Sequence, residues 1–195
     1  MTKILYLGTD PSRYGRDVIH CPLIDTRPLP LPDIDLDAFT HVILTSPNAA
    51  RILASQMSLQ NKKNLTIGVG TTDTLMQMGL KCFASAFPET QEGMINLLKR
   101  ISFENSYLFY PRSSAARPLL ANYLIETGLK HTICDLYETI FLKPHPLPLL
   151  SDFDEIVFTS PSTIKAFLTL YGSIPKNKKL TCIGPITRQA LQNSG

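Results

Sequence analysis

Short apolar runs, each followed by a polar corner and then an amphipathic stretch, recur along this chain. The runs "VIL" at 42–44 and "IVF" at 156–158 are short and rich in β-branched residues, which is typical of buried parallel strands. After each run, apolar residues return at spacings of three and four, which indicates a helix. This alternation predicts an α/β fold with parallel sheets. Further extended segments are expected at "KILYLG", "KCFAS", "SYLFYP" and "TICDLYETIFL", and a helix in "RSSAARPLLANYLIETG" ending at Gly128.

Two of these units repeat one another. "HVILTSPNAARILASQ" begins at His41, and "EIVFTSPSTIKAFLTLYG" begins 114 positions later at Glu155. About twenty residues after each corner, the pattern G-x-x-T-x-x-x-L-x-x-x-G follows, and its two copies are offset by 116 positions. The copies consist of Gly68, Thr71, Leu75 and Gly79, and of Gly184, Thr187, Leu191 and Gly195. Two motifs in the same order at nearly the same offset predict a duplicated β-α-β-α unit and therefore two related lobes.

Two proline-rich stretches divide the chain. "LIDTRPLPLPDIDL" and "FLKPHPLPLLSDF" cannot be helices or central strands, so they are interpreted as connections. We therefore predict linker strands at 21–36 and 133–148 and a continuous lobe at 37–132. The other lobe is expected to combine residues 1–20 with 149–195.

Composition narrows the class of protein. The 195 residues are 44% hydrophobic with a formal charge of +3, which is ordinary for a globular domain. No apolar run approaches the roughly 20 residues of a membrane span, and "ILYLG" resembles a first strand rather than a signal peptide, so we expect a cytoplasmic protein. Basic residues form no stripe interleaved with aromatics, so we expect no nucleic-acid partner. The cysteines and histidines are dispersed, so we expect no metal site, and the absence of a coiled-coil pattern favours a monomer.

The repeated corners have two interpretations. Ser46 and Ser160 stand at the N-cap position, with Pro47 and Pro161 at the first helical position, and simple helix capping explains both. Alternatively, free backbone N–H groups and the hydroxyls of the corner form an anion seat at the carboxyl end of a parallel strand. Side chains available for such seats are those of Thr45, Ser46, Asn48, Ser160 and Ser162.

The glycine turns offer a similar choice. A missing Cβ at Gly68 or Gly184 permits close approach to the backbone of the following residues, and Thr71 and Thr187 then place a hydroxyl at a helix start. The turn is neither a Walker A loop nor a G-x-G-x-x-G fingerprint, so a flavodoxin-like binder of FMN or NAD is a weaker alternative. Arg112 is either a further anion contact or a solvent-exposed loop arginine. Since no triad, H-E-x-x-H motif or paired carboxylates occur, a hydrolase or metalloenzyme is disfavoured.

The paired T-S-P-x and G-x-x-T-x-x-x-L motifs, together with "LFYPRSSAARPLLANYLIETG" and "DLYETI", resemble the uroporphyrinogen-III synthase family over nearly the whole chain. The resemblance implies two flavodoxin-like lobes joined by a two-stranded β linker. It implies cyclisation of the linear tetrapyrrole hydroxymethylbilane, which carries eight carboxylates, to uroporphyrinogen III, with loss of water and inversion of the last ring. It implies a lyase of haem biosynthesis that needs no cofactor. A non-catalytic module that binds tetrapyrroles or polyanions on the same fold is the alternative.

The resemblance also assigns residues. Tyr137 in "DLYETI" matches the family tyrosine that assists departure of the hydroxyl, although aromatic packing on the linker also accounts for it. Positions expected to hold the substrate are Thr45, Ser46, Asn48, Gly68, Val69, Gly70, Thr71, Arg112, Ser113, Ser160, Ser162, Pro185, Ile186 and Thr187. The family usually has a helix where "TDPSRYGRD" is too short for one, and it usually continues beyond Gly195 with a further strand and helix. We therefore expect a shortened lobe at the chain ends.

Overall fold

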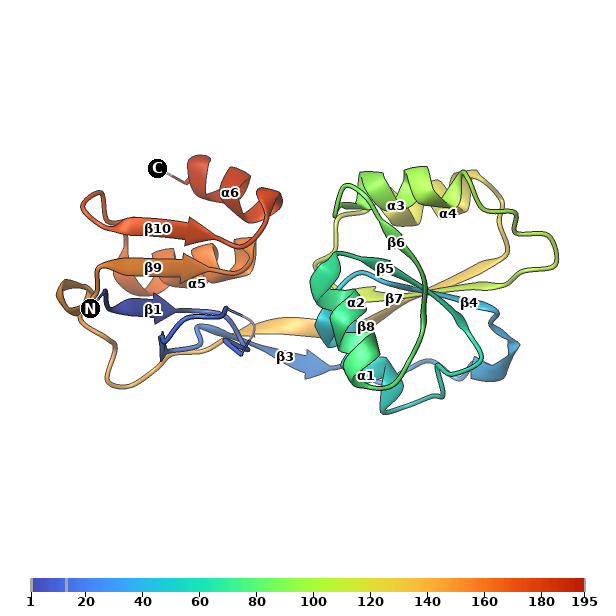
Figure 1. Ribbon diagram of the computed structural model, residues 1–195, viewed down its shortest axis with the longest axis horizontal. Coiled ribbons are helices and arrows are strands. Elements are labelled where there is room, and N and C mark those ends of the chain that lie inside the picture. The colour runs from blue at the N-terminus through green and yellow to red at the C-terminus, as the bar shows by residue number, and fades with distance from the viewer. Residues whose placement is uncertain (1, 13, 195) are drawn as a thin grey trace. The chain divides into compact units, whose positions relative to one another are not determined.

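The chain forms two compact α/β units (Figure 1). The computed structural model describes residues 2–12 and 14–194. The terminal unit combines residues 1–26 with 139–195, and the central unit is the continuous segment Arg27–Glu138. The division falls inside two strands, β3 (Ile24–Pro28) and β8 (His131–Phe141). The linker assignment to 21–36 and 133–148 stays a prediction.

The sheet of the central unit has the strand order β3-β8-β7-β4-β5-β6. Neighbouring strands from β8 to β6 pair in parallel. Besides β3 and β8, the strands are β4 (His41–Leu44), β5 (Lys63–Ile67), β6 (Cys82–Ala86) and β7 (Leu108–Ser113). The helices are the 3-10 turn η1 (Leu36–Ala38), α1 (Pro47–Ala54), α2 (Val69–Gln77), α3 (Gln91–Leu98) and α4 (Leu119–Glu126).

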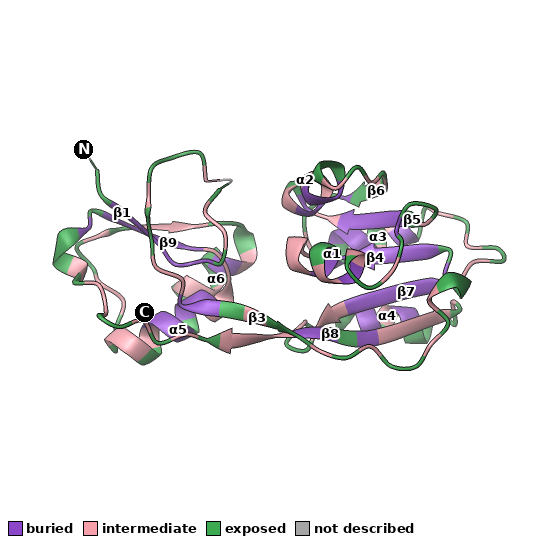
Figure 2. Ribbon diagram, turned by 90° about the horizontal axis from the view of Figure 1, so that it is seen from below, coloured by how far each residue is buried: buried purple, intermediate pink, exposed green. Residues whose placement is uncertain are grey.

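Helices cover both faces of the central sheet because its strands are apolar on both sides. Val42 and Leu44 pack with α1 and with Leu75 of α2, whereas Ile43 between them packs with α3 and α4. Figure 2 shows the buried residues of β4, β5 and β7 as a continuous layer between the helices. A layered α/β unit with parallel strands was predicted from the apolar runs, and this coarse prediction is confirmed.

The terminal unit contains a smaller, parallel sheet of order β10-β9-β1-β2. Its strands are β1 (Ile4–Tyr6), β2 (Ile19–His20), β9 (Glu155–Phe158) and β10 (Lys179–Cys182). Its helices are the 3-10 turn η2 (Leu150–Asp152), α5 (Pro161–Tyr171) and α6 (Pro185–Gln192). Gly195, the last residue of the repeated glycine motif, lies outside the described residues.

The two faces of this smaller sheet are covered differently. Leu5 and Phe158 face α5, whose Phe167 stacks edge-on against Phe158. On the opposite face, Tyr14 and Val18 from the loop after β1 pack over a small cluster of Ile4, Tyr6 and Val157. The residues described between β1 and β2 form no helix, as expected from the short "TDPSRYGRD" segment. The loop thus stands where a helix would otherwise cover the sheet.

A buried carboxylate anchors this loop. Glu155, at the start of β9, is 1% exposed and accepts hydrogen bonds from Tyr14 Oη at 2.9 Å and Arg16 Nη1 at 2.9 Å. Lys179 Nζ at 3.1 Å and Thr181 Oγ1 at 2.7 Å approach the same carboxylate from β10. Burial alone would raise the pKa of Glu155, but these hydrogen bonds outweigh it and lower the pKa from 4.5 to about 2. One charged group therefore joins the loop, β9 and β10.

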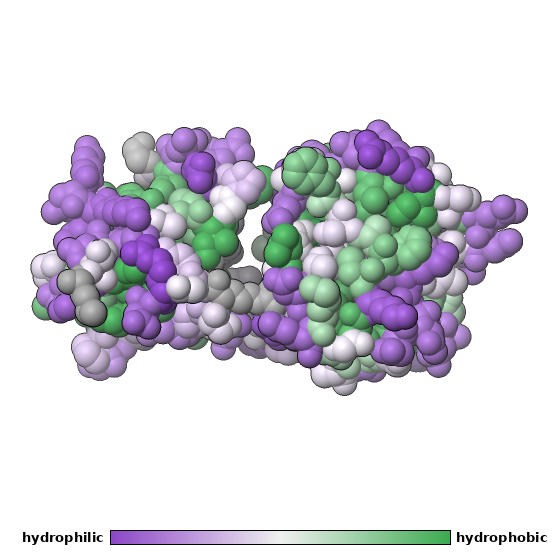
Figure 3. All heavy atoms as spheres, viewed as in Figure 1, coloured by the Kyte–Doolittle hydropathy of each residue, from purple (hydrophilic) through white to green (hydrophobic). Residues whose placement is uncertain are grey.

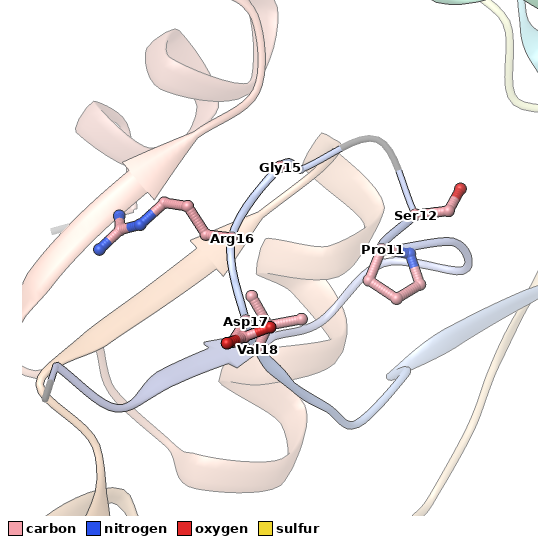
Figure 4. Close-up of a pocket in the computed structure, with 6 residues that line it drawn as sticks. All are labelled: Pro11, Ser12, Gly15, Arg16, Asp17 and Val18. Atoms are coloured by element: carbon pink, nitrogen blue, oxygen red, sulfur yellow. The ribbon is translucent and has the colours of Figure 1, made fainter.

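Residues of the same loop also line an open surface hollow of about 630 Å³. Figure 4 shows Arg16 extending toward the strands and Ser12 pointing in another direction. The labelled side chains therefore do not converge on a common point, so this hollow is not a candidate functional site.

His41 makes the stability of the central unit sensitive to mild acid. It is 1% exposed, its Nδ1 lies 2.8 Å from Thr40 Oγ1, and its buried Nε2 has no hydrogen-bond partner among residues 2–12 and 14–194. Burial first, and Lys63 second, lower the pKa of His41 below its usual 6.5. Because the unfolded chain then binds the proton more tightly, stability is expected to be constant above pH about 6.5 and to decrease below it.

Urea denaturation at several pH values between 7.5 and 5.5 tests this expectation. His41→Leu is expected to reduce the loss of stability between pH 7.5 and 5.5. An equal loss in the variant and the unsubstituted protein would assign the acid sensitivity to other groups.

One helix begins later than the sequence pattern suggested. We expected a helix through "RSSAARPLLANYLIETG", but α4 starts at Leu119 and Arg112 belongs to β7. Pro118 is the reason, because the residue before a proline is disfavoured in the helical region. The predicted end is correct, since Gly128 follows α4 with φ 65°. Among the described residues, no helix is both long and apolar enough to cross a membrane.

Candidate active site

The carboxyl ends of β8, β7, β4 and β5 lie side by side at one edge of the central sheet. In an open parallel sheet this edge is where ligands usually bind. Ser113 at the end of β7 pairs in register with Tyr137 of β8, and the corner Thr45–Ser46 follows the neighbouring β4. Gly68 follows β5. The topology therefore gathers predicted site residues from segments far apart in sequence.

Tyr137 is the centre of a small hydroxyl cluster. Its phenolic oxygen lies 2.8 Å from Ser46 Oγ, and Ser113 of the neighbouring strand pairs with Tyr137 in register. The side chain is 7% exposed. Burial raises the pKa of Tyr137, while the hydrogen bonds from Ser46 and Ser113 act in the opposite direction. The phenol therefore remains protonated at neutral pH and can donate a hydrogen bond or a proton.

Arg112 is not a loop arginine. It lies within β7, and its Nε donates to Asp135 Oδ1 at 2.9 Å, with 22% of the arginine side chain exposed. Pro111 is tolerated next to it in the strand because β4 pairs with β7 only as far as Phe109. Arg112 therefore lies inside the strand and not in a loop after it. Its guanidinium already pairs with the carboxylate of Asp135.

Thr45 lies directly after β4 and is partly exposed. The neighbouring phenol of Tyr110 is fully buried, and burial raises its pKa to about 12. Gln91 Nε2 lies 3.5 Å from this phenol, and Gln91 Oε1 accepts the backbone N–H of Leu120 at 3.2 Å. The assignment of Thr45 as a substrate-holding hydroxyl stays a prediction. Asn48, in the first turn of α1, is partly exposed.

The two corners cap their helices as predicted. Ser46 Oγ accepts the N–H of Ala49 at 3.1 Å, and Ser160 Oγ accepts the N–H of Thr163 at 3.3 Å. Pro47 starts α1, and Pro161 starts α5 in the same way.

The corners differ at the third helical residue. Thr163 Oγ1 accepts the backbone N–H groups of Thr159 and Ser160, both at 3.2 Å, and donates to the carbonyl of Ser160 at 2.7 Å. The expected anion seat of the terminal unit is therefore filled by its own side chain, which corrects the interpretation of Ser160 as a carboxylate holder. Ala49 at the equivalent position has no hydroxyl, so this closure cannot form in the central unit. Ser162 remains partly exposed beside the closed corner.

The glycine turns are set by backbone geometry. Gly68 (φ 85°, ψ 148°) and Gly184 (φ 96°, ψ 159°) are the N-caps of α2 and α6 in a region that other residues rarely adopt. Thr71 and Thr187 are 1% and 3% exposed, and Thr187 Oγ1 donates to the carbonyl of Ile183 at 3.3 Å. The expectation that these two hydroxyls face a ligand is wrong, because both side chains pack inward.

The backbone around the turns is more accessible. Val69 is 63% exposed, and its N–H donates to Glu89 Oε1 at 3.2 Å. Gly70 and Ile186 are partly exposed, and Pro185 occupies the first position of α6. On the face in Figure 3, hydrophobic residues gather over the central unit, and the exposed apolar side chains of α2 include Val69 and Met76.

Replacing either N-cap glycine with alanine is expected to cost about 1–2 kcal/mol of stability, because alanine is strained at these angles. A Cβ at Gly68 would also meet Glu89 Oε2 at 3.0 Å, whereas at Gly184 it would meet nothing within 4 Å. Gly68→Ala is therefore expected to be the more destabilising of the pair in chemical denaturation. The reverse order would mean that Glu89 moves aside without cost.

Sequence reasoning missed three of these arrangements. The closure by Thr163 was visible in the repeat as a Thr-for-Ala difference, but nothing in the sequence linked Ser46 to Tyr137 across the sheet. Nothing in the sequence indicated that Glu89 accepts the backbone N–H of Val69. Within residues 2–12 and 14–194, no group of three or more His, Cys, Asp or Glu side chains could hold a metal ion. The prediction of a cofactor-free site stays a prediction.

Comparisons with known proteins agree on one family. The family model described as uroporphyrinogen-III synthase HemD matches residues 9–195. No curated protein sequence matches at a significant level.

Solved structures share the fold. A uroporphyrinogen-III synthetase from Helicobacter pylori 26695 is 24% identical, with TM-score 0.67 over 99% of this chain and 89% of that one. A mutant uroporphyrinogen III synthase from the extremely thermophilic bacterium Thermus thermophilus is 17% identical, with TM-score 0.62 over 100% of this chain and 90% of that one. The family match spans nearly the whole sequence and includes the strand that bears Tyr137. The chain therefore belongs to the uroporphyrinogen-III synthase family.

Proposed function

We propose that this chain is a uroporphyrinogen-III synthase. It cyclises hydroxymethylbilane to uroporphyrinogen III with loss of water and inversion of the last ring. The observation that carries the proposal is the buried Tyr137 phenol, 2.8 Å from Ser46 Oγ at the carboxyl edge of the central sheet in a chain of this family.

Tyr137 supplies the proton for the first step. As the bond between carbon and the terminal hydroxyl breaks, the oxygen leaves with the electron pair and takes the phenolic proton, so water departs. The substrate keeps a positive charge that spreads onto the pyrrole nitrogen, and Tyr137 is left as a phenolate. After ring closure through a spiro intermediate, loss of a ring proton restores the phenol. The remaining work of the site is to position the substrate and to exclude water from the reactive intermediate.

Fewer side chains hold the carboxylates than the motifs suggested. The candidate side chains that are partly exposed include those of Thr45, Asn48, Ser113 and Ser162, and Arg112 shares its charge with Asp135. Pro185 has no N–H to donate, so it can contribute only shape. The octacarboxylate substrate is recognised chiefly through short polar side chains.

A second part of the proposal concerns how the chain is divided into lobes. We infer that strands 21–36 and 133–148 link two lobes, of which the terminal one is flavodoxin-like. In the terminal unit, the order β2-β1-β9-β10 supports this, since it equals the first four places of the flavodoxin-like order 2-1-3-4-5. In the central unit the order counted from β4 is 3-2-1-4-5, which differs from the flavodoxin-like order because two strands lie on the side of the first strand where that order has one. We further infer that the protein acts as a cytoplasmic monomer.

The test is an assay coupled to enzymatic production of hydroxymethylbilane, with the uroporphyrinogen isomers separated by chromatography. We expect mostly the III isomer when the protein is present and the uncatalysed I isomer when heat-inactivated protein is used. If the folded protein binds the tetrapyrrole product but leaves only the I isomer, the proposal is wrong and the chain is a binding module.

A further inference from the structure

We propose that Ser46 is a positioning residue that acts through Tyr137. In this arrangement, the Ser46 hydroxyl donates to the phenolic oxygen, directs the phenolic proton away from itself toward the substrate, and stabilises the phenolate left when that proton departs. The inference rests on the proposed synthase function, and it assigns Ser46 a role other than holding a substrate carboxylate.

The hydrogen bonds of Ser46 allow this direction. A serine hydroxyl has one proton and two acceptor lone pairs. One lone pair accepts the N–H of Ala49 at 3.1 Å, and the same oxygen lies 2.8 Å from Tyr137 Oη, a contact in which either oxygen can donate. If Ser46 donates to Tyr137, the phenolic proton is left available for another acceptor.

The position of the serine is fixed by the chain around it. Ser46 has an extended backbone (φ −157°, ψ 155°), and Pro47 begins α1 directly after it. The helix cap thus holds Oγ in place before any ligand binds. A preorganised donor aimed at an oxygen that becomes charged costs no rearrangement during the reaction. Ser46 therefore serves the helix and the phenol with the same oxygen.

The twin corner shows that capping alone does not require a tyrosine. Ser160 has nearly the same backbone angles (φ −160°, ψ 164°) and caps α5 with the same type of hydrogen bond. Its side chain is part of a capping box with Thr163. The contact between Ser46 and Tyr137 is therefore an addition to the corner and not a consequence of its fold.

The experiment compares Ser46→Ala with Thr90→Ala. Thr90 caps α3 in the same unit by accepting the N–H of Gly93 at 3.2 Å, and α1 and α3 each have 8 residues. Each variant is expected to lose a similar amount of stability from the lost cap, seen as similar decreases in the urea denaturation midpoint. Only Ser46→Ala is expected to lower kcat by roughly ten-fold with little change in KM. Ser46→Thr, which restores a hydroxyl, is expected to recover most of kcat.

Two further readouts separate positioning from capping. In the Tyr137→Phe background, Ser46→Ala is expected to have no further effect on kcat, because its route of action is already gone. In protein labelled with 3-fluorotyrosine, the Tyr137 ¹⁹F signal, assigned by its absence in Tyr137→Phe, should titrate at higher pH in Ser46→Ala than in Thr90→Ala.

The outcomes distinguish the two proposals. If the unsubstituted protein forms no III isomer, the synthase proposal fails, while the ¹⁹F titration still reports whether Ser46 donates to Tyr137. If the protein is active but Ser46→Ala and Thr90→Ala have equal kcat, or if the Ser46→Ala effect is undiminished in Tyr137→Phe, the positioning role is wrong.

Discussion

Tyr137→Phe is expected to lower kcat by at least about ten-fold and to shift the product toward the I isomer, because general-acid groups typically contribute about 10²–10⁴ in rate. The substitution removes only the phenolic oxygen of a residue that is 7% exposed, so the packing of the ring in the central unit is kept. With the phenol gone, the departing hydroxyl has no proton donor at this position. The linear substrate then has time to close without enzyme. The measurement is the initial rate and isomer ratio in the coupled assay.

Tyr107→Phe is the matched control. The Tyr107 hydroxyl lies 2.8 Å from Thr132 Oγ1, so this variant also loses one hydrogen bond between two side-chain hydroxyls. Tyr107, however, precedes β7 and lies at the opposite end of the sheet from the candidate site. Its kcat is expected to stay unchanged. An unchanged kcat in Tyr137→Phe as well would remove Tyr137 from the mechanism.

Glu155→Gln is expected to produce the largest loss of stability among the variants considered, on the order of 3 kcal/mol at neutral pH. This value follows from the difference between a pKa of 4.5 and one of about 2 for a carboxyl that is 1% exposed. Because the folded pKa is the lower one, the stabilisation is fully present above pH 4.5 and is lost as the pH falls toward 2. Hydrogen exchange of the β1 and β9 amides measures the loss in the terminal unit itself.

Glu92→Gln provides the comparison. Glu92 pairs with Arg117 at 2.7 Å, and this hydrogen bond is the main cause that lowers the pKa of Glu92 to about 2 as well. These side chains are 51% and 42% exposed, so solvent screens the pair and the expected loss is at most about 1 kcal/mol. Similar losses in the two variants would mean that burial of Glu155 adds nothing to its ion pairs.

Structural elements could be predicted from the sequence where they depend on residues that are close together in the chain. The apolar runs that became β4 and β9 and the serines that cap α1 and α5 depend on neighbouring residues, so periodicity and capping rules found them. The start of α4 was predicted too early, because the spacing of apolar residues indicated a helix on both sides of Pro118. The helix begins only after this proline. The cover that Tyr14 and Val18 place over the small sheet was not predictable, because it depends on a buried acid 141 positions away from Tyr14.

The candidate site was predicted in outline and not in its chemistry. The strand topology did bring Ser46, Ser113 and Tyr137 together. The direction in which each hydroxyl points, however, depends on the partner that it meets in three dimensions. Thr187, for example, is 3% exposed and donates to the carbonyl of Ile183, so a hydroxyl of the expected type points inward.

The closed corner at Thr163 has a consequence for competition between the fold and an added anion. Thr163 Oγ1 already accepts the N–H groups of Thr159 and Ser160, so an anion that approached these two groups would first have to displace a hydrogen bond supplied by the protein itself. Ala49 has no side-chain oxygen that could act as such an internal competitor.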